Sequence, residues 1–288
     1  MNSILLGWRR PLKRAMAAVL PEGVKKHLRA PLYGYRRARV ALPVSFEADR
    51  GASRITIDGR VALRFAEEHR AVFRTHFVDH GAAVEEMASF IGLAAGARVL
   101  FDIGADRAIF SHVFCAMDAP NRAVAYEPSP DRMRSAKSLA AMNGFGDRIL
   151  YRDCALQRQP GRATASVFAD RTVVVGASPD GLGTIDVDIS SVDREVAQLG
   201  LVPDLLKIDV EGDEYDVLLG AQRLLGERKP AICLELHLDL LERRGTPARL
   251  VVALLESHGY RFRTCRGDAL RPREVSDSVH AILRLVAV

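Results

Sequence analysis

The sequence predicts an α/β fold in which an open, mostly parallel β-sheet is covered by helices on both faces. From residue 97 onward, short apolar segments alternate with amphipathic segments of helical length. Such alternation is typical of parallel sheets whose strands are joined by crossover helices. Hydrophobic residues make up 48% and charged residues 27% of the 288 residues. These proportions are close to those of globular domains and exclude wholesale disorder.

The first 44 residues are expected to form a basic, amphipathic extension. Residues 1–40 carry a net charge of +9, whereas the rest of the chain carries −4, which together give the total of +5. Apolar residues recur every three or four positions from Leu5 to Leu20, and Pro11 and Pro21 limit them to two short helices. Two interpretations stay open. The extension lies on an anionic membrane surface, or it is an ordinary first helix or a basic tail.

The cysteine and hydropathy patterns indicate a cellular compartment. The four cysteines are widely spaced and contain no C-x-x-C pair, which excludes the common zinc and thioredoxin signatures and favours a reducing environment. No apolar run approaches the ~18 residues of a membrane span. We therefore expect a cytoplasmic protein, held at most peripherally at the inner membrane face through residues 1–40. The acidic body and few aromatic residues argue against a nucleic-acid partner.

The core is expected to begin near residue 45. Residues 53–65 predict two short strands around the Asp58–Gly59 turn, and residues 82–94 predict a helix that ends near Gly96. Strands are then predicted at 97–103, 122–127, 147–152, 204–210 and 230–236. Helices are predicted at 107–118, 130–142, 213–226 and 247–258, and a last hairpin at 259–265 and 280–287. Since such sheets bind ligands beyond the carboxyl ends of their strands, functional residues should follow each strand.

The loop after the first of these five strands predicts a binding site for a cationic nucleoside. Gly104 permits a sharp turn and a close backbone approach to a ligand. Glu127 ends the next strand 23 residues later, where an acid can bind both hydroxyls of a ribose. Asp102 and Asp106 would repel phosphates, whereas the sulfonium and ammonium groups of S-adenosylmethionine suit such a field. The alternative interpretation of this loop alone is a tight turn without a ligand.

Charged residues gather after the fourth and fifth of these strands. Strand alternation places Lys207, Asp209 and Glu211 on one side of an extended segment. Asp213 and Glu214 are expected to be solvated acids at the N-terminus of the next helix, where they favour its dipole. The fifth strand ends in Glu235-Leu236-His237, two polar side chains that point the same way. These groups lie where the ligand crevice of the sheet should be.

The ordered motifs resemble those of the FkbM family of S-adenosylmethionine-dependent methyltransferases. The resemblance covers about residues 95–265 and includes DIGAD-x5-S (102–111), YEPSP (126–130), a helix leading to Asn143, SVD (191–193), LLKIDVEGDEYDVLLGA (205–221) and ELH (235–237). It implies a class I methyltransferase (Rossmann-like) fold with a mostly parallel, seven-stranded sheet. By this resemblance, residues 95–288 are expected to form the S-adenosylmethionine-binding domain, after a hairpin and helix in residues 45–94.

The resemblance also implies a set of cofactor-binding residues. They are Asp102, Gly104, Ala105, Asp106, Ser111, Glu127, Pro128 and, near the adenine, Asp153. Two residues depart from the family pattern, which usually has asparagine at position 106 and glycine at position 108. Ala108 is expected to add a methyl group near the cofactor.

The family usually transfers the methyl group to a hydroxyl of a sugar or another small metabolite, so an O-methyl transfer is expected. An alcohol acceptor needs a general base, for which we expect His237, then Asp209 or Glu211, with Lys207 orienting a carboxylate or lowering the pKa of the acceptor. Alternatively, Asp209, Glu211 and Glu235 or His237 are ligands of Mg²⁺. Segment 155–190, around a predicted hairpin, would help to form the acceptor pocket. A nicotinamide-dependent oxidoreductase and a non-catalytic Rossmann-like binding module are the alternative functions.

Overall fold

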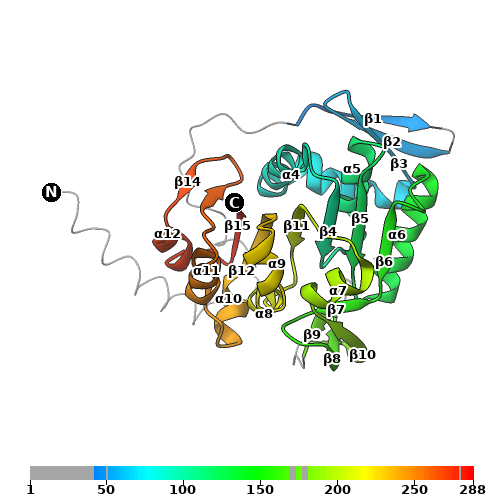
Figure 1. Ribbon diagram of the computed structural model, residues 1–288. Helices are drawn as coiled ribbons and strands as arrows, with labels where there is room; N and C mark the ends of the chain where they lie inside the picture. Colours follow the sequence, from blue (N-terminus) through cyan, green and yellow to red (C-terminus); the bar gives the residue numbers. More distant parts are fainter. Residues whose placement is uncertain (1–41, 50, 169–172, 177–180, 279) are drawn as a thin grey trace, which may run out of the picture. The chain divides into compact units, whose positions relative to one another are not determined.

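The computed structural model describes residues 42–49, 51–168, 173–176, 181–278 and 280–288 (Figure 1). The chain divides into two compact units, Arg39–Ser278 with Ile282–Val288 and Met1–Ala38 with Val279–Ala281. Almost all of the second unit, and with it the predicted basic extension, lies outside the described residues. The fold below is that of the larger unit, in whose described residues no helix is long and apolar enough to cross a membrane.

The main sheet of the described chain has eight strands in the order β14-β13-β15-β12-β11-β4-β5-β6. Five of them are parallel: β4 (Val99–Ile103), β5 (Arg122–Tyr126), β6 (Ile149–Arg152), β11 (Leu205–Ile208) and β12 (Ala231–His237). The other three are antiparallel to their neighbours: β13 (Phe262–Thr264), β14 (Ala269–Leu270) and β15 (Ile282–Ala287). The predicted α/β fold is confirmed, and β14 is a short strand beyond the seven expected.

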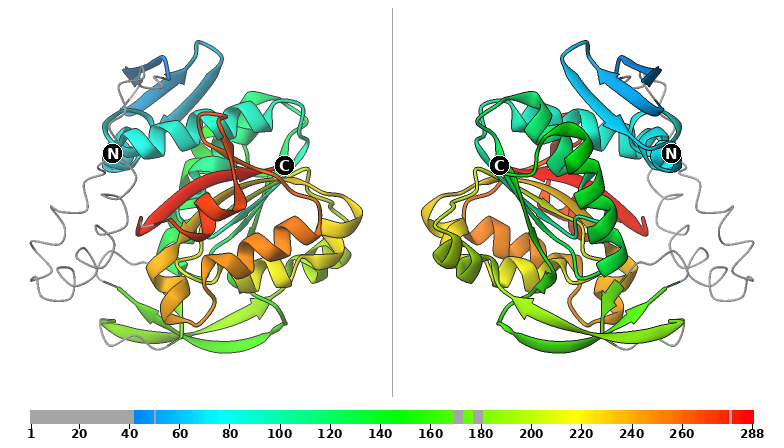
Figure 2. Two further views of the ribbon diagram at one scale, coloured as in Figure 1. Left: turned by 90° about the vertical axis from the view of Figure 1, so that its left-hand side faces the viewer. Right: turned by 90° about the vertical axis from the view of Figure 1, so that its right-hand side faces the viewer.

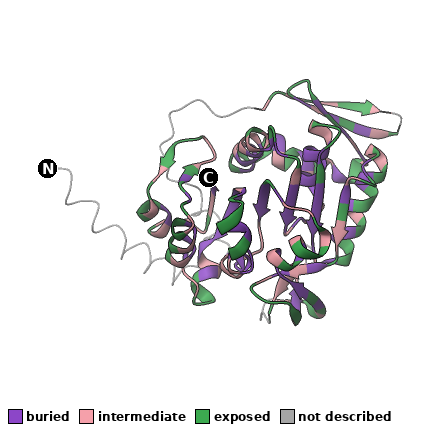
Figure 3. Ribbon diagram, viewed as in Figure 1, coloured by how far each residue is buried: buried purple, intermediate pink, exposed green. Residues whose placement is uncertain are grey.

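Helices cover both faces of this sheet and enclose a separate hydrophobic core on each (Figure 2). One core contains side chains of α4 (Gly81–Ala94), α5 (Ile109–Met117) and α6 (Pro130–Asn143). The other contains side chains of α7 (Val192–Leu199), α8 (Glu214–Leu219), α9 (Gln222–Glu227), α10 (Leu238–Arg243), α11 (Ala248–Ser257) and α12 (Pro272–Ser276). Because both faces are covered, the central strands β4, β5, β11 and β12 are buried except at the first residue of β4, β5 and β12 (Figure 3).

A three-stranded antiparallel sheet precedes the main sheet in the chain. It consists of β1 (Val44–Asp49), β2 (Ala52–Ile57) and β3 (Val61–Phe65), and the predicted β2–β3 hairpin turns at Asp58. The Asn143 amide accepts a hydrogen bond from Arg64 N at 2.7 Å and donates one to Arg64 O at 2.8 Å. The end of α6 thereby pairs with β3 as a neighbouring strand would.

The segment between this sheet and α4 contains three short helical turns that the sequence did not predict. They are a 3₁₀ turn (η1, Glu67–His69), α3 (Arg70–Arg74) and a π-helix (η2, Thr75–Asp79). The buried rings of Phe65 and Phe73 stack at 4.3 Å and attach this segment to the core. The predicted helix at 82–94 is confirmed as α4.

A small four-stranded sheet follows β6 directly, at the carboxyl edge of the main sheet. Its order is β7-β10-β8-β9, formed by β7 (Cys154–Leu156), β8 (Gly161–Val167), β9 (Val173–Val175) and β10 (Gly183–Ser190). The hairpin predicted within residues 155–190 is therefore part of a larger sheet. Its core is small, with Ala165, Val187 and Ile189 buried.

One predicted helix is wrong in its extent. The expected helix at 213–226 is broken into α8 and α9 at Gly220 and Ala221. A Cβ atom at Gly220 would lie 2.2 Å from the backbone oxygen of Gln157, so the chain needs glycine here for a close approach to the strand end after β7. The short helix α10, directly after β12, was not predicted.

Candidate active site

The order of the strands reverses between β4 and β11, because β4 continues to β5 on one side and β11 to β12 on the other. Ligands of such sheets bind at this reversal, beyond the carboxyl ends of the strands. Two groups of residues meet there. One is the first loop, residues 104–108 between β4 and α5. The other is the charge cluster, formed by the side chains of Lys207, Asp209, Glu211, Glu214, Glu235 and His237.

Gly104 brings the first loop against the strand end of β11. Its φ is +75°, and a Cβ atom at this position would lie 1.7 Å from the backbone oxygen of Asp209. On its other side, the N–H groups of Gly104 and Ala105 both donate to Tyr126 O at 3.0 Å. The predicted close backbone approach at Gly104 is therefore a contact within the protein, which holds the first loop against the end of β11.

Asp102 and Ser111 hold the start of α5 from inside the protein. Both are buried, and Asp102 Oδ2 accepts hydrogen bonds from Ser111 N at 3.1 Å and from Ser111 Oγ at 2.7 Å. Burial raises the pKa of Asp102 to about 6, although Ser111 opposes this shift. Their contribution to the site is therefore to shape the first loop.

Glu127 lies at the carboxyl end of β5, beside the first loop. Its two carboxylate oxygens accept hydrogen bonds from Asp106 N at 2.9 Å and from Ser129 N at 2.8 Å. Burial raises its pKa to about 7, while these N–H groups act in the opposite direction. Each oxygen keeps a second lone pair, so the carboxylate can also accept the two hydroxyls of a ribose. Pro128, which follows, is half-buried.

The electrostatic expectation for Asp106 needs correction. Its carboxylate lies 2.9 Å from Arg107 Nη1 and 2.7 Å from Arg132 Nη1. The two guanidinium groups neutralise its charge, so Asp106 does not supply the field for a cationic ligand that we inferred from the sequence. What it supplies to the site is its backbone N–H, which positions Glu127.

The expectation for Ala108 is also wrong. Its side chain is fully buried in the core that α5 shares with α4 and α6, away from solvent, and adds no methyl group to the crevice. The departure from glycine appears in the backbone instead, where Ala108 has a φ of +55°. This left-handed conformation costs an L-residue about 1–2 kcal/mol.

His237 is the centre of the charge cluster. Its Nδ1 donates to Glu214 Oε1 at 2.7 Å, and its Nε2 lies 3.2 Å from Glu211 Oε2 and 3.8 Å from Asp209 Oδ1. Burial lowers the pKa of His237, but the hydrogen bond to Glu214 and the charges of Glu211 and Asp209 outweigh burial and raise it to about 9. The predicted grouping of Asp209, Glu211, Glu235 and His237 is therefore present in the fold.

The positions of Glu211 and Glu214 differ from the expectation. The extended segment ends at Ile208, and Glu211 reaches His237 through a turn in which its own φ is +53°. Asp213 and Glu214 are not solvated but 4% and 0% exposed. Glu214 also accepts a hydrogen bond from Gly212 N at 3.1 Å, whereas Asp213 pairs with Arg244 at 2.9 Å. Glu214 thus belongs to the site, rather than to a solvent-exposed helix end.

Lys207 is 1% exposed and enclosed by acids. Its Nζ lies 3.1 Å from Glu86 Oε1, 3.4 Å from Asp209 Oδ2 and 5.0 Å from the ring centroid of Phe110. Burial opposes its charge, but Asp209 and Glu86 outweigh burial and hold its pKa well above the ordinary value. In return, Lys207, His237 and Arg284 outweigh the burial of Asp209 and lower its pKa.

Glu86, Glu214 and Arg284 were not assigned to the site from the sequence. Arg284 on β15 pairs with Glu86 at 3.0 Å and also with Glu235. Burial, together with repulsion from Asp209 and Glu86, raises the pKa of Glu235 to about 8. The one signal for Glu86 was an acid on the apolar face of a predicted helix, where a buried charge requires a partner.

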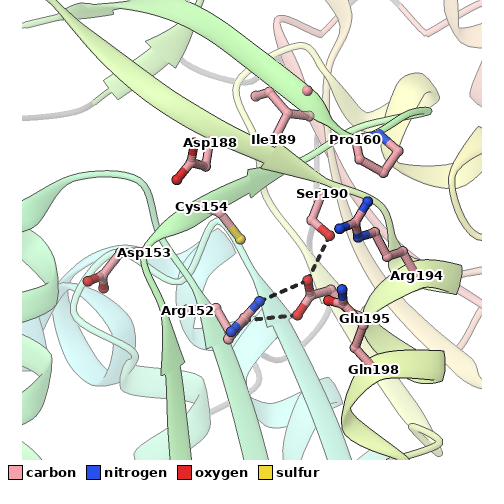
Figure 4. Close-up of a pocket in the computed structure, with 11 residues that line it drawn as sticks. Arg152, Asp153, Cys154, Pro160, Asp188, Ile189, Ser190, Arg194, Glu195 and Gln198 are labelled. Atoms are coloured by element: carbon pink, nitrogen blue, oxygen red, sulfur yellow. Dashed lines mark hydrogen bonds and ion pairs between the residues drawn. The ribbon is translucent and has the colours of Figure 1, made fainter.

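Asp153 lies apart from the charge cluster, beside a polar cavity of about 420 Å³ under the small sheet (Figure 4). Within the cavity, Arg152 Nε and Ser190 Oγ donate to the buried carboxylate of Glu195 at 3.0 and 2.6 Å. Asp153 itself is largely exposed and lies 3.8 Å from Lys137. Because Glu127 N donates to Arg152 O at 3.1 Å, this cavity lies next to the strand end that carries Glu127.

The residues fit S-adenosylmethionine, and one group of three could hold a cation. Glu127 has lone pairs for a ribose, and the charge cluster is rich in carboxylates that suit a sulfonium. Ligand atoms of Asp209, Glu211 and His237 all lie within 4.8 Å of one another. However, His237 must lose its proton before it can bind a metal, and its pKa of about 9 opposes this loss.

Comparisons with known proteins place the chain in a family. The family described as Methyltransferase FkbM domain matches residues 102–262. Similar solved structures include a methyltransferase FkbM from Methylobacillus flagellatus KT, with 17% identity and a TM-score of 0.42 over 66% of this chain. The chain covers 43% of that protein's length. The comparison with curated proteins finds no significant match.

Other similar structures are methyltransferases of different kinds. A precorrin-6y C5,15-methyltransferase from Geobacter metallireducens GS-15 has 15% identity and a TM-score of 0.41, over 70% of this chain and 85% of its own. A ribosomal protein L11 methylase from Lactobacillus delbrueckii subsp. bulgaricus has 12% identity and a TM-score of 0.41, over 73% and 79%. Since the family match spans more than half of the sequence, the chain belongs to the FkbM family of S-adenosylmethionine-dependent methyltransferases.

Proposed function

We propose that this protein transfers the methyl group of S-adenosylmethionine to a hydroxyl group, carried by a sugar, a glycan or another small metabolite. The observation that carries the proposal is the pairing of Glu214 with His237 Nδ1, which leaves Nε2 facing Asp209 and Glu211 beside the first loop. Once it has lost its own proton, whose pKa is about 9, this histidine can remove a proton from an alcohol. Family membership favours methyl transfer over the nicotinamide-dependent and non-catalytic alternatives.

For the cofactor, we assign the crevice between the first loop and Asp209. Glu127 would bind the ribose hydroxyls, and the backbone of Gly104, Ala105 and Asp106 would line the amino-acid part. Asp102 and Ser111 act indirectly, because each already bonds the other. Pro128 and the exposed Asp153 would border the adenine, next to the polar cavity under the small sheet.

The bound cofactor would supply an electrophilic methyl group, and the protein would align the acceptor with it and take up the proton. His237 Nε2 would accept the hydroxyl proton during attack, while Glu214 keeps the ring in the required orientation and tautomer. Asp209 and Glu211 would stabilise the imidazolium that results, since both lie within 4 Å of Nε2. Lys207 would hold the Asp209 carboxylate in place and keep it ionised.

A second mechanism uses Mg²⁺ as the group that polarises the acceptor hydroxyl. Asp209, Glu211 and either Glu235 or His237 would be its ligands, since the first two and His237 lie close enough together. The two mechanisms differ in their response to a chelator. Removal of divalent cations would leave the rate unchanged in the base mechanism and abolish it in the metal mechanism.

The location of the protein is a separate proposal. Residues 1–40 would bring the methyltransferase to an anionic membrane surface on the cytoplasmic side, which suits a lipid-linked glycan as acceptor. These residues lie outside the described part of the chain, so this proposal depends on their sequence alone. A vesicle-binding comparison of the full chain with a variant lacking residues 1–40 would test it.

Methyl transfer is tested with S-adenosylmethionine that carries a labelled methyl group and a panel of free sugars, nucleotide sugars and lipid-linked glycans. We expect an acceptor whose label resists mild alkali, as a methyl ether does, and no transfer by the Asp209→Asn and His237→Asn variants. The exposed Asp147 offers a matched control, and Asp147→Asn should be as active as the wild type. An alkali-labile methyl ester as product, or full activity of Asp209→Asn, would contradict the proposal.

A further inference from the structure

His76 lies in a segment that the family match does not include and that adjoins the charge cluster. It belongs to the π-helix η2, which directly precedes α4, whereas the match begins at residue 102. π-helical turns are rare and often occur at functional sites. The position of this turn therefore directs attention to the side chains that it presents to the core.

The His76 ring rests on the same aromatic side chain as Lys207. Its centroid lies 5.8 Å from that of Phe110 with the two planes at 80°, and Lys207 Nζ lies 5.0 Å from the Phe110 centroid. The charges that act on His76 come from Glu86 on α4, Lys207 and Asp209 at the end of β11, and Asp106 in the first loop. His76 thus lies on Phe110, the side chain that Lys207 of the charge cluster also contacts.

One nitrogen of the His76 ring has no hydrogen-bond partner within the described chain. His76 Nδ1 is enclosed and has no hydrogen-bond partner among the described residues. Burial lowers the pKa of His76, so its ring is neutral and carries one N–H that can be donated. A buried polar group without a partner costs free energy, and a ligand group that bonds the ring would remove this cost.

The chemistry of the crevice indicates which ligand group this is. Carboxylates dominate the charge cluster and suit the sulfonium and ammonium of S-adenosylmethionine, but its α-carboxylate needs a donor. The nearby cations already lie within 3.1 Å of an acid: Lys207 of Glu86, and Arg107 and Arg132 of Asp106. His76 has no such partner.

We propose that His76 donates an N–H to the α-carboxylate of S-adenosylmethionine and so selects a cofactor that carries this group. The proposal rests on the cofactor site described above and adds a binding residue from outside the matched family segment. It concerns affinity and not the transfer step, so it can be tested without knowledge of the acceptor.

The test compares two ligands that differ only in the carboxylate: S-adenosylmethionine and decarboxylated S-adenosylmethionine. Their dissociation constants are measured by calorimetry for the wild type and for His76→Phe, which keeps a ring against Phe110 but has no N–H. His80→Phe is the matched control, because His80 is an exposed histidine four residues further along the chain. His76→Gln, which restores an N–H donor, is the conservative variant.

We expect the wild type and His80→Phe to prefer S-adenosylmethionine by about ten- to a hundredfold, the effect of a hydrogen bond to a charged group. His76→Phe should lower the affinity for S-adenosylmethionine by this factor and leave the affinity for the decarboxylated ligand unchanged. His76→Gln should recover part of the preference. An unchanged preference in His76→Phe, or an equal loss for both ligands, would overturn the proposal. Failure of the wild type to bind either ligand would instead overturn the cofactor assignment itself.

Discussion

Single residues of the site adopt backbone conformations that L-residues usually avoid. Asp106, Ala108 and Glu211 all have φ between +51° and +55°. Each such conformation costs of order 1–3 kcal/mol and persists only where the surrounding structure imposes it. Asp106 thereby directs its N–H to Glu127, and Glu211 is brought to His237. The sequence could place these residues after their strands, but not predict the turns that aim them.

The protonation of His237 depends most directly on Glu214. We predict that a proton NMR titration of His237, assigned with His237→Asn, has its midpoint at about pH 9. Glu214→Gln should move the midpoint toward the ordinary value of about 6.5, because the hydrogen bond that favours the imidazolium is lost. A wild-type midpoint near 6.5 would show that Glu214, Glu211 and Asp209 do not act on His237 as the geometry implies.

The raised pKa of His237 also makes the free energy of unfolding depend on pH. Since the pKa of His237 is higher in the folded protein, the pair with Glu214 stabilises the fold fully below about pH 6.5. This contribution is lost as the pH rises from about 6.5 to about 9. Glu214→Gln should therefore reduce the difference in the free energy of unfolding between these two pH values.

Glu127 predicts a pH dependence of cofactor affinity. Only the ionised carboxylate accepts both ribose hydroxyls, and burial raises its pKa to about 7. The affinity for S-adenosylmethionine should therefore increase from about pH 6 to about pH 8, and less so in Glu127→Gln. Calorimetry on both proteins isolates the effect of Glu127, because the titration of the ligand is common to them. If the affinity changed with pH equally in the two proteins, the assignment of Glu127 to the ribose hydroxyls would be contradicted.

Among the helices and strands, the sequence patterns predicted best the segments that are buried on both faces. The strands β4, β5, β11 and β12 are buried on both faces and read as apolar runs, so each was found within two residues of its ends. The break between α8 and α9 was missed, because it follows from the contact of Gly220 with Gln157, 63 residues away. Likewise, η2 and α10 are too short to produce a periodic pattern.

The link between α6 and β3 gives a prediction for one such long-range contact. Asn143→Ala removes three hydrogen bonds, two to Arg64 and one to Leu139 O at 2.8 Å. We expect the free energy of unfolding to fall by about 1–3 kcal/mol, as measured by denaturant titration. Gln198→Ala, which truncates an exposed amide on α7, should change it by less than about 0.5 kcal/mol. Equal effects of the two substitutions would mean that Asn143 does not hold β3.

At the scale of the whole molecule, a buried network of charges joins segments that are distant in sequence. Glu86 from α4 and Arg284 from β15 meet Lys207 on β11 and Glu235 on β12. Removal of one partner from such a network leaves an uncompensated charge, which typically costs about 3–5 kcal/mol. The ordered motifs could predict the family and the location of the site, but not this network, because Glu86 and Arg284 lie outside those motifs.

We assign S-adenosylmethionine to the surface beside the first loop, which Gly104 holds against Asp209, and calorimetry on three proteins tests this assignment. We predict that the wild type and Gly146→Ala bind the cofactor equally, because a Cβ atom at Gly146 would meet nothing within 4 Å. Gly104→Ala should not bind, because its Cβ atom would lie 1.7 Å from Asp209 O and force the first loop away from the end of β11. No binding by the wild type, or wild-type affinity in Gly104→Ala, would contradict the account.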